Sequence, residues 1–241
     1  MRAIMLYAHK TIHLFKLKGA FFMAKKIFEK YKHGWVFLYA FIYLPWFFYL
    51  EKHVTTEFSE IHVALDDKIP FIEFFIVPYM LWFLFIAVTI GYFFFTNKTE
   101  FYQLIVFLFS GMTIFLIIST IFPNGLDLRP DTFVRDNIFV DMVKTLYKTD
   151  TPTNVLPSIH VYNSIGAYVA IRNSQALQKH KWVQTGSLIL TVSIILSTMF
   201  LKQHSVVDVI VAFGMSAICY VFAYGVEKNR SHNLIENLAK N

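Results

Sequence analysis

Six apolar stretches constrain the fold of this 241-residue chain more than any other feature of its sequence. They cover residues 35–50, 71–95, 101–122, 158–173, 182–201 and 206–226. Apolar runs of about 20 residues are typical of membrane-spanning helices. Charged residues make up only 16% of the chain, below the roughly 25% of soluble domains. We therefore predict an all-α fold, a polytopic membrane bundle of six transmembrane helices.

The fourth stretch is the least apolar, because polar side chains occupy its first turns. These residues are Ser158, His160, Tyr162, Asn163 and Ser164. Polar residues at the end of a span usually face the bundle interior or a cavity. We therefore expect this end of the fourth span to face inward.

The longest connecting segment, residues 123–157, has a helical pattern of its own. Its apolar residues Phe139, Met142, Val143, Leu146 and Tyr147 recur at helical spacing. We predict a short amphipathic helix over residues 136–148, lying at the outer membrane interface. Two roles remain open for this helix: a rim that admits a lipid headgroup, or packing alone.

The distribution of lysine and arginine indicates the orientation of the bundle. With the N-terminus inside, fifteen of the 22 Lys and Arg residues fall on internal segments and seven on external ones. By the positive-inside rule, both termini are then cytoplasmic. The net charge of +6 is spread along the connecting segments, so it does not indicate a nucleic-acid partner. The single cysteine, Cys219, excludes an internal disulfide framework and a thiolate metal cluster.

Two short motifs lie where apolar stretches begin, both at the predicted outer face. The first is Pro157-Ser158-Ile159-His160, and the second is His204-Ser205-Val206-Val207-Asp208. Residues four apart share one face of a helix, so Asp208 can accept a proton from one nitrogen of the His204 ring. The other nitrogen is then a nucleophile held as in a catalytic triad. His160 can protonate the leaving alkoxide, because an ordinary imidazole titrates near pH ~6.5.

Three further residues are candidates to bind a phosphate. Arg129 offers a bidentate guanidinium, Lys202 a point charge and Ser158 a hydroxyl. Arg129 also has an ordinary interpretation, as a loop residue at the interface. A metal site of His160, His204 and Asp208 is another interpretation. The two cations nearby disfavour it, so we expect neither a metal nor a cofactor.

This pattern resembles the type 2 phosphatidic acid phosphatase superfamily of membrane-bound lipid phosphatases and phosphotransferases. The family's motifs are matched by Arg129-Pro130, by Pro157-Ser158-Ile159-His160, and by His204 with Asp208. The resemblance implies a six-helix bundle with its site on the outer side. It also implies His204 as the nucleophile, Asp208 as its partner, His160 as the acid, and no metal.

The chain departs from the family pattern at two cationic positions. The family has a lysine seven residues before the arginine of its first motif, where this chain has Phe122. The third motif has an arginine where this chain has Thr198. Segments 154–160 and 201–208 instead resemble the inositolphosphorylceramide-synthase-like branch, which keeps the two histidines and the aspartate but relaxes the outer cations.

We expect three parts in the chain. Residues 1–33 form a basic amphipathic N-terminal segment, 34–227 the six-helix transmembrane catalytic domain and 228–241 a polar cytoplasmic tail. The helical spacing of apolar residues from Leu14 to Tyr31 suits either a helix on an anionic inner leaflet or an ordinary lead-in to the first span. Met23 resembles a start site, which raises the hypothesis that residues 1–22 are an upstream extension.

Three functions follow as hypotheses. The first is a cell-membrane lipid phosphatase that hydrolyses a lipid phosphate or a polyprenyl diphosphate through a phosphohistidine on His204, without a metal. The second is a lipid phosphotransferase that moves a phospho-headgroup to a hydroxyl acceptor. The third is a non-catalytic membrane transporter or scaffold. The expected partners are a membrane lipid substrate and the bilayer, and the sequence indicates no oligomeric state.

Overall fold

The computed structural model describes residues 22–23, 25–54 and 57–239, without the side chains of 226–239. The predicted 1–22 extension therefore falls almost wholly outside the described residues. Of the predicted N-terminal amphipathic segment, residues 22–23 and 25–33 are described, and 25–31 are helical. The chain divides into two compact units at Tyr39. The first unit contains the 3-10 helix η1 (Lys32–Tyr39). The predicted functional division into segment, domain and tail stays a prediction.

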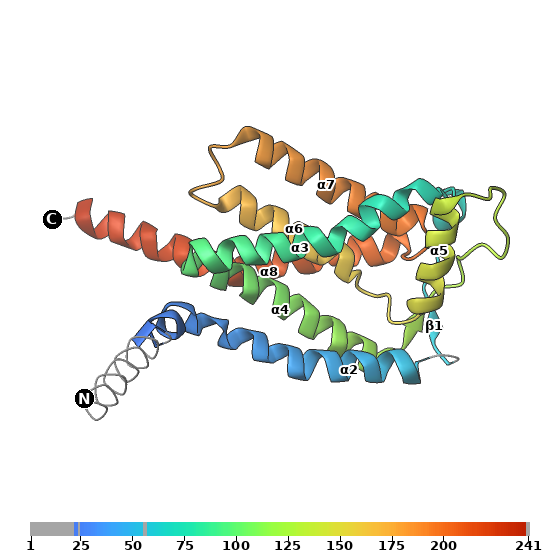
Figure 1. The fold of residues 1–241 in the computed structure, drawn as a ribbon, viewed down its shortest axis with the longest axis horizontal. Coiled ribbons are helices and arrows are strands. Elements are labelled where there is room, and N and C mark those ends of the chain that lie inside the picture. The colour runs from blue at the N-terminus through green and yellow to red at the C-terminus, as the bar shows by residue number, and fades with distance from the viewer. Residues whose placement is uncertain (1–21, 24, 55–56, 240–241) are drawn as a thin grey trace, which may run out of the picture. The chain divides into compact units, whose positions relative to one another are not determined.

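The second unit is a helical bundle in which α5 crosses one end of the long helices (Figure 1). Its α-helices are α2 (Ala40–His53), α3 (Ile76–Thr96), α4 (Lys98–Ile121), α5 (Ile138–Thr149), α6 (Ile159–Asn173), α7 (Lys181–Phe200) and α8 (Val206–Ala239). The other elements are η2 (Asp66–Lys68), η3 (Glu73–Phe75) and the paired parallel strands β1 (Ser59–Glu60) and β2 (Asn124–Gly125). The predicted all-α class is confirmed, with one very short two-stranded ribbon added.

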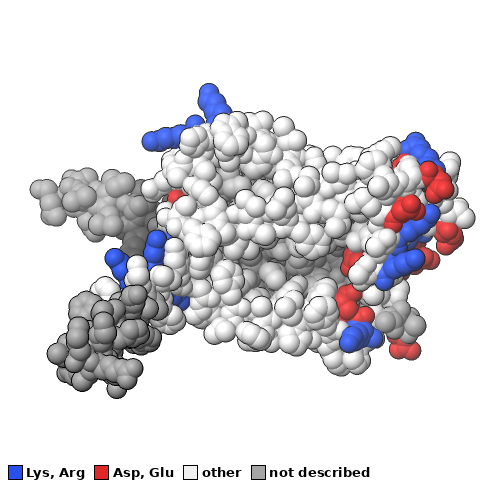
Figure 2. Space-filling view, viewed as in Figure 1, with Lys and Arg blue, Asp and Glu red and all other residues white. Residues whose placement is uncertain are grey.

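Five helical segments are long and apolar enough to cross a membrane. They are Lys25–His53, Glu73–Thr96, Lys98–Ile121, Lys181–Phe200 and Val206–Gly225. These correspond to five of the six predicted spans, and the remaining one, predicted at 158–173, is the 15-residue helix α6. Figure 2 shows the charged side chains at the two ends of the molecule, with an almost uncharged band between them. This distribution is the one expected for helices in a bilayer.

The short helix α6 packs against α3, α4, α7 and α8. The Tyr162 hydroxyl donates to the Phe107 carbonyl at 2.6 Å, and the two rings stack with centroids 4.7 Å apart. Asn163 and Ser164 are also buried on this helix. A helix that its neighbours shield from lipid does not need an apolar surface. This shielding explains why the fourth predicted span is the least apolar.

The helix predicted over residues 136–148 is confirmed as α5. The Asn137 side chain caps its first turn, accepting from the Phe139 and Val140 N–H groups at 3.0 Å each. The apolar face packs inward, where Val143 is fully buried against Ile76 and Leu201. α5 therefore covers the end of the bundle at which both motifs lie.

The last helix is longer than predicted. The sixth span was expected to end at residue 226, before a polar tail at 228–241. Instead α8 continues without a break to Ala239. The tail is therefore helical over most of its length, and its cytoplasmic location stays a prediction.

Gly111 on α4 lets the Tyr162 ring pack directly on the helix backbone. A Cβ at Gly111 would overlap that ring, whereas a Cβ at Gly214 on α8 would meet nothing within 4 Å. We expect Gly111→Ala to lower the free energy of unfolding by about 1–3 kcal/mol, the usual cost of overpacking. Gly214→Ala is the matched control and should be neutral or slightly stabilising. Thermal unfolding midpoints in detergent compare the two variants, and equal midpoints would contradict the packing described.

Candidate active site

A cavity of about 1010 Å³ lies among α2, α3, α4, α5 and α6. His160 and His204 both line it. Three carboxylates also line the cavity, from Glu51, Asp141 and Asp150, and among the described residues no Lys or Arg does. The two predicted catalytic histidines therefore share one cavity, and the charged side chains in its wall are acidic.

The two imidazole rings lie close together although they come from different elements. Their centroids are 6.0 Å apart and their planes are inclined by 57°. His160 is in the first turn of α6, and His204 lies in the turn that connects α7 to α8. The convergence of the two motifs that the sequence suggested is therefore present.

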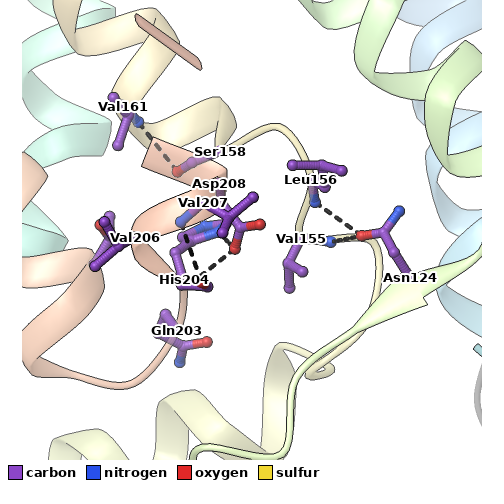
Figure 3. A network of polar contacts seen from close by, with 12 residues as sticks. Asn124, Val155, Leu156, Ser158, Val161, Gln203, His204, Val206, Val207 and Asp208 are labelled. Carbon is purple, nitrogen blue, oxygen red and sulfur yellow. Dashed lines mark hydrogen bonds and ion pairs between the residues drawn. The ribbon is translucent and has the colours of Figure 1, made fainter. Parts of the chain in front are cut away.

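Asp208 orients the His204 ring (Figure 3). Its Oδ2 lies 3.3 Å from His204 Nδ1 and also accepts from the Ser205 N–H at 2.9 Å. Both side chains are buried, with 9% of His204 and none of Asp208 exposed. Because Asp208 occupies the Nδ1 side of the ring, Nε2 is the nitrogen left for chemistry.

This pair forms by a different local geometry from the one predicted. α8 begins at Val206, so His204 precedes the helix and does not lie one helical turn from Asp208. Ser205 Oγ accepts from the Val207 N–H at 3.1 Å, while Asp208 reaches back to the Ser205 N–H. These reciprocal bonds resemble a capping box, except that the Ser205 hydroxyl accepts from the second helical N–H instead of the third. The helix start itself therefore brings the Asp208 carboxylate to the turn that carries His204.

The backbone of this turn is fixed at the end of α7. The Thr198 carbonyl accepts from the N–H groups of Gln203 and His204 at 2.9 and 3.0 Å. Lys202 has a left-handed backbone conformation, with φ of 53°. This conformation reverses the chain direction between the two helices.

Asp66 supports the same turn, and the sequence analysis did not single it out. It is 2% exposed and lies between α2 and α3. Its carboxylate accepts from Ser205 Oγ at 2.7 Å, from the Val206 N–H at 2.8 Å and from the Val63 N–H at 3.0 Å. Asp66 thus caps α8 from a distant part of the chain. Neighbouring acidic residues look the same in sequence, so no spacing could have marked it.

The loop before α6 is held by Asn124, another residue that the sequence analysis missed. Its Oδ1 accepts from the N–H groups of Val155 and Leu156 at 2.9 and 2.8 Å (Figure 3). Ser158 then begins α6, with Oγ accepting from the Val161 N–H at 3.4 Å. The Ser158 N–H is 3.4 Å from the Asp208 carbonyl oxygen. A backbone contact therefore ties the two motifs together directly.

Aromatic side chains of α3 hold the His160 ring. The ring centroids of Tyr79 and Trp82 lie 4.6 and 4.3 Å from that of His160. The Tyr79 hydroxyl donates to Asp150 Oδ2 at 3.3 Å, and burial raises the pKa of the Asp150 carboxyl. Among the described residues, none lies within hydrogen-bond distance of His160 Nε2. That nitrogen is therefore buried and unpaired within the described part of the chain.

Arg129 lies behind the cavity wall rather than in it. It donates to the Tyr147 carbonyl at 3.2 Å and to Gln203 Oε1 at 2.8 Å, and it stacks over the Tyr147 ring at 4.5 Å. Burial lowers the pKa of its guanidinium, while the Asp150 carboxylate opposes the shift. Gln203 lines the cavity, and its Nε2 has no partner among the described residues. Arg129 therefore fixes the Gln203 amide with its N–H groups left as donors.

The structure places the other two predicted phosphate ligands elsewhere. The Lys202 ammonium donates to the Asp66 carbonyl at 2.7 Å, and burial lowers its pKa. The Ser158 hydroxyl is fully buried as the cap of α6. Neither side chain lines the cavity. Their direct contact with a phosphate, expected from sequence, has no support in this geometry.

At the two positions where the family pattern has a cation, this chain has an uncharged side chain. Phe122 is 40% exposed at the end of α4. Thr198 is buried, with its hydroxyl donating to the Ile195 carbonyl at 2.7 Å. Within the described part of the chain, no group of three or more His, Cys, Asp or Glu side chains is arranged to hold a metal ion.

Comparison with protein-family models matches residues 104–231 to the PAP2 superfamily. This chain belongs to the PAP2 superfamily. The match runs from within α4 to within α8 and includes both motifs of the PAP2 chain. Comparisons with curated proteins and with solved structures found no significant match. The superfamily predicted from the motifs is confirmed, and its inositolphosphorylceramide-synthase-like branch stays a prediction.

The role of Asp66 in this PAP2 chain can be tested against its neighbour Asp67. Asp66→Ala leaves Ser205 Oγ and the Val206 N–H without their acceptor in a buried site. We expect a loss of about 1–3 kcal/mol of unfolding free energy for each such group. Asp67, whose side chain is 63% exposed, pairs with the surface residue His62 at 2.8 Å. Asp67→Ala should change the stability by less than about 0.5 kcal/mol.

Thermal unfolding in detergent measures both variants in parallel. The account requires a lower midpoint for Asp66→Ala than for Asp67→Ala. Similar midpoints would show that the contacts of Asp66 do not stabilise the start of α8.

Proposed function

We propose that this PAP2-superfamily protein is an integral membrane lipid phosphatase acting on a lipid phosphate or a polyprenyl diphosphate. Membership of the superfamily and the apolar helices support a membrane-embedded, phosphatase-type enzyme. The observation that carries the finer proposal is the 6.0 Å separation of the His160 and His204 rings in one cavity. The function of a transporter or scaffold would not require the two imidazole rings to lie close together.

The first step forms a phosphohistidine. His204 Nε2 attacks the phosphorus, and a P–N bond forms as the P–O bond to the lipid breaks. The proton on Nδ1 stays directed at Asp208, whose carboxylate stabilises the positive charge on the ring. A proton passes from His160 to the departing lipid oxygen. The products are the phosphorylated enzyme and a lipid alcohol, or a polyprenyl phosphate where the substrate is a diphosphate.

The second step returns the enzyme to its starting state. His160, now neutral, takes a proton from a water molecule whose oxygen attacks the phosphorus. The P–N bond breaks, and its electron pair returns to His204. Inorganic phosphate leaves, and His160 carries its proton again. Each atom and charge of the two steps is thereby balanced.

Gln203 and Arg129 are proposed to stabilise the negative charge of the transition state. Preorganised donors aimed at developing charge are an effective means of catalysis in a site that excludes water. Gln203 lines the cavity with its amide nitrogen unpaired among the described residues, and Arg129 holds the amide oxygen. In this proposal, the positive charge of Arg129 acts on the phosphate through the neutral Gln203 amide. The pair takes the place of the cations absent at positions 122 and 198.

We also propose that the active site faces the outside of the cell membrane and that both termini are cytoplasmic. The bias of Lys and Arg toward the segments on the N-terminal side of the membrane supports this orientation. The charges at two separate ends of the molecule in Figure 2 suit the same multi-pass arrangement.

Substitution of the two histidines tests the proposed roles. In detergent and EDTA, we expect His204→Ala to abolish phosphate release from phosphatidic acid or undecaprenyl diphosphate. Substrate labelled in the phosphate should leave an acid-labile label on the wild type and none on His204→Ala. His160→Ala should lose about 10²–10⁴-fold in rate, the usual contribution of a general acid. His62→Ala, a surface histidine paired with Asp67, is the control and should keep full activity.

Two results would contradict this assignment. Activity that persists in His204→Ala would exclude this residue as the nucleophile. Loss of wild-type activity in EDTA would show that the reaction needs a metal.

A second candidate, lipid phosphotransferase, is favoured by the charge of the cavity wall. Glu51, Asp141 and Asp150 line the cavity, and no described Lys or Arg does. A phosphodiester carries one negative charge and a monoester up to two, so the acidic wall repels a phosphodiester less. A diester donor would give a phospho-headgroup on His204, which a hydroxyl acceptor then takes.

Supplying acceptors separates transfer from hydrolysis. With a phospholipid labelled in its headgroup phosphate, transfer predicts a new labelled lipid that forms only when an alcohol acceptor is present. Hydrolysis predicts release of a water-soluble labelled product at the same rate with or without the alcohol. Thin-layer separation of the lipid and aqueous products distinguishes the two.

A further inference from the structure

Asn163 is a buried amide whose oxygen has no hydrogen-bond partner. It is 3% exposed, lies on α6 and lines the cavity. None of the described residues lies within hydrogen-bond distance of its Oδ1. Buried polar atoms almost always have a partner, and an unpaired one is especially costly where lipid replaces water. Packing alone therefore does not account for an amide at this position.

Trp82, on the facing helix, has an unpaired donor that complements the unpaired acceptor of Asn163. It lines the same cavity from α3, and its Nε1 has no partner among the described residues. Its ring lies 4.3 Å from that of His160. A buried indole N–H usually finds an acceptor. The cavity thus holds an unused donor from Trp82 and an amide from Asn163 that can both donate and accept.

These two residues lie at the boundary between the polar and apolar parts of the cavity. Beyond Trp82 along α3, the lining residues are Phe83, Ile86, Ala87 and Ile90, and all are apolar. Toward the start of α3 and the end of α5, the wall contains Tyr79 and Asp150 instead. A cavity that changes from polar to apolar along its length matches an amphiphile that enters with its chains deepest.

The position of Asn163 relative to His160 indicates which part of a lipid it would meet. Asn163 follows His160 by three residues on α6, a rise of about 4.5 Å. Only a few covalent bonds separate the phosphorus of a phospholipid from the groups that link its chains. A phosphorus atom at His160 therefore places those linking groups beside Asn163.

We propose that Asn163 and Trp82 form a subsite for the polar linkage between the phosphate and the chains of a lipid. The shared chemistry is a carbonyl group, which belongs to the esters of a glycerolipid or to the amide of a sphingolipid. The carbonyl accepts from the Trp82 N–H and the Asn163 amide N–H, and a sphingolipid N–H can donate to Asn163 Oδ1. This subsite rests on the proposed function, because His160 and His204 mark where the phosphorus lies.

The test compares lipids that differ only in the linkage. The probes are dioleoyl phosphatidic acid, its dialkyl-ether counterpart without carbonyl groups, and ceramide 1-phosphate, all in detergent micelles. We expect Asn163→Leu to lower kcat/KM by about tenfold, the effect of one lost hydrogen bond, for a carbonyl-bearing lipid. The same variant should leave kcat/KM for the ether lipid unchanged. The arm that shows the loss, ester or amide, identifies the source of the carbonyl.

Two further variants control for misfolding of Asn163→Leu and for the general effect of removing a buried polar group. Trp82→Phe removes the N–H and keeps an aromatic ring beside His160, so it should show the same selective loss if Asn163→Leu does not fold. Ser216→Ala removes another buried polar group, one that donates to the Ala212 carbonyl at 2.7 Å and does not line the cavity. It should leave the ratio of ester to ether activity unchanged.

The outcomes separate this subsite from the proposed function. An equal loss for carbonyl and ether lipids, or no loss for either, would overturn the subsite while the phosphatase activity stands. If the wild type turns over neither these probes nor undecaprenyl diphosphate, the proposed function fails instead. Lipid binding measured by thermal stabilisation in a His204→Ala background then still tests the subsite. In that background, Asn163→Leu must lower the affinity for the carbonyl-bearing lipid about tenfold and leave the affinity for the ether lipid unchanged. An equal change for both lipids would overturn the subsite.

Discussion

The first turn of α8 is buried inside the bundle, and its backbone N–H groups need acceptors there. Two carboxylates provide acceptors at this helix start: Asp66, from the segment between α2 and α3, for the Val206 N–H, and Asp208 for the N–H of Ser205 just before the helix. Asp208 uses the same oxygen to hold the His204 ring. The capping of a helix and the orientation of the proposed nucleophile are therefore one structural device. Loss of either carboxylate would disturb both, because a buried N–H without an acceptor destabilises the turn that carries His204.

The cavity reconciles two opposed requirements. Phosphoryl transfer needs donors and titratable rings, whereas the membrane disfavours polar groups that have no partners. The bundle meets both by placing the polar groups on α6, which other helices surround, and at the end covered by α5. His160 is held between aromatic rings rather than by hydrogen bonds, so its Nε2 stays available. Arg129 lies behind Gln203, so its positive charge stays out of a wall whose charged side chains, among the described residues, are all acidic.

The sequence predicted those features that are local. The amphipathic pattern of α5 and the apolar spans depend on spacing within one segment, and the histidine motifs depend on a few adjacent residues. The features it missed depend on contacts between distant segments. Asp66 and Asn124 bond to backbone groups that lie far along the chain, and nothing near them in sequence marks that role. Lys202 and Ser158 were expected to bind phosphate for their chemistry alone, but a carbonyl of another loop and a helix start take up their polar atoms.

The central claim is that His204 attacks phosphorus while His160 protonates the departing oxygen. The most direct measurement compares a lipid phosphate with an aryl phosphate, whose phenolate leaves without needing a proton. Because His160 also activates water in the second step, the rate to compare is that of the first step, measured as the burst of leaving-group release in a single turnover. The account predicts that the aryl substrate restores most of the first-step rate lost in His160→Ala and none of the first-step rate lost in His204→Ala. Rescue of neither variant, or of both equally, would contradict the division of roles between the two rings.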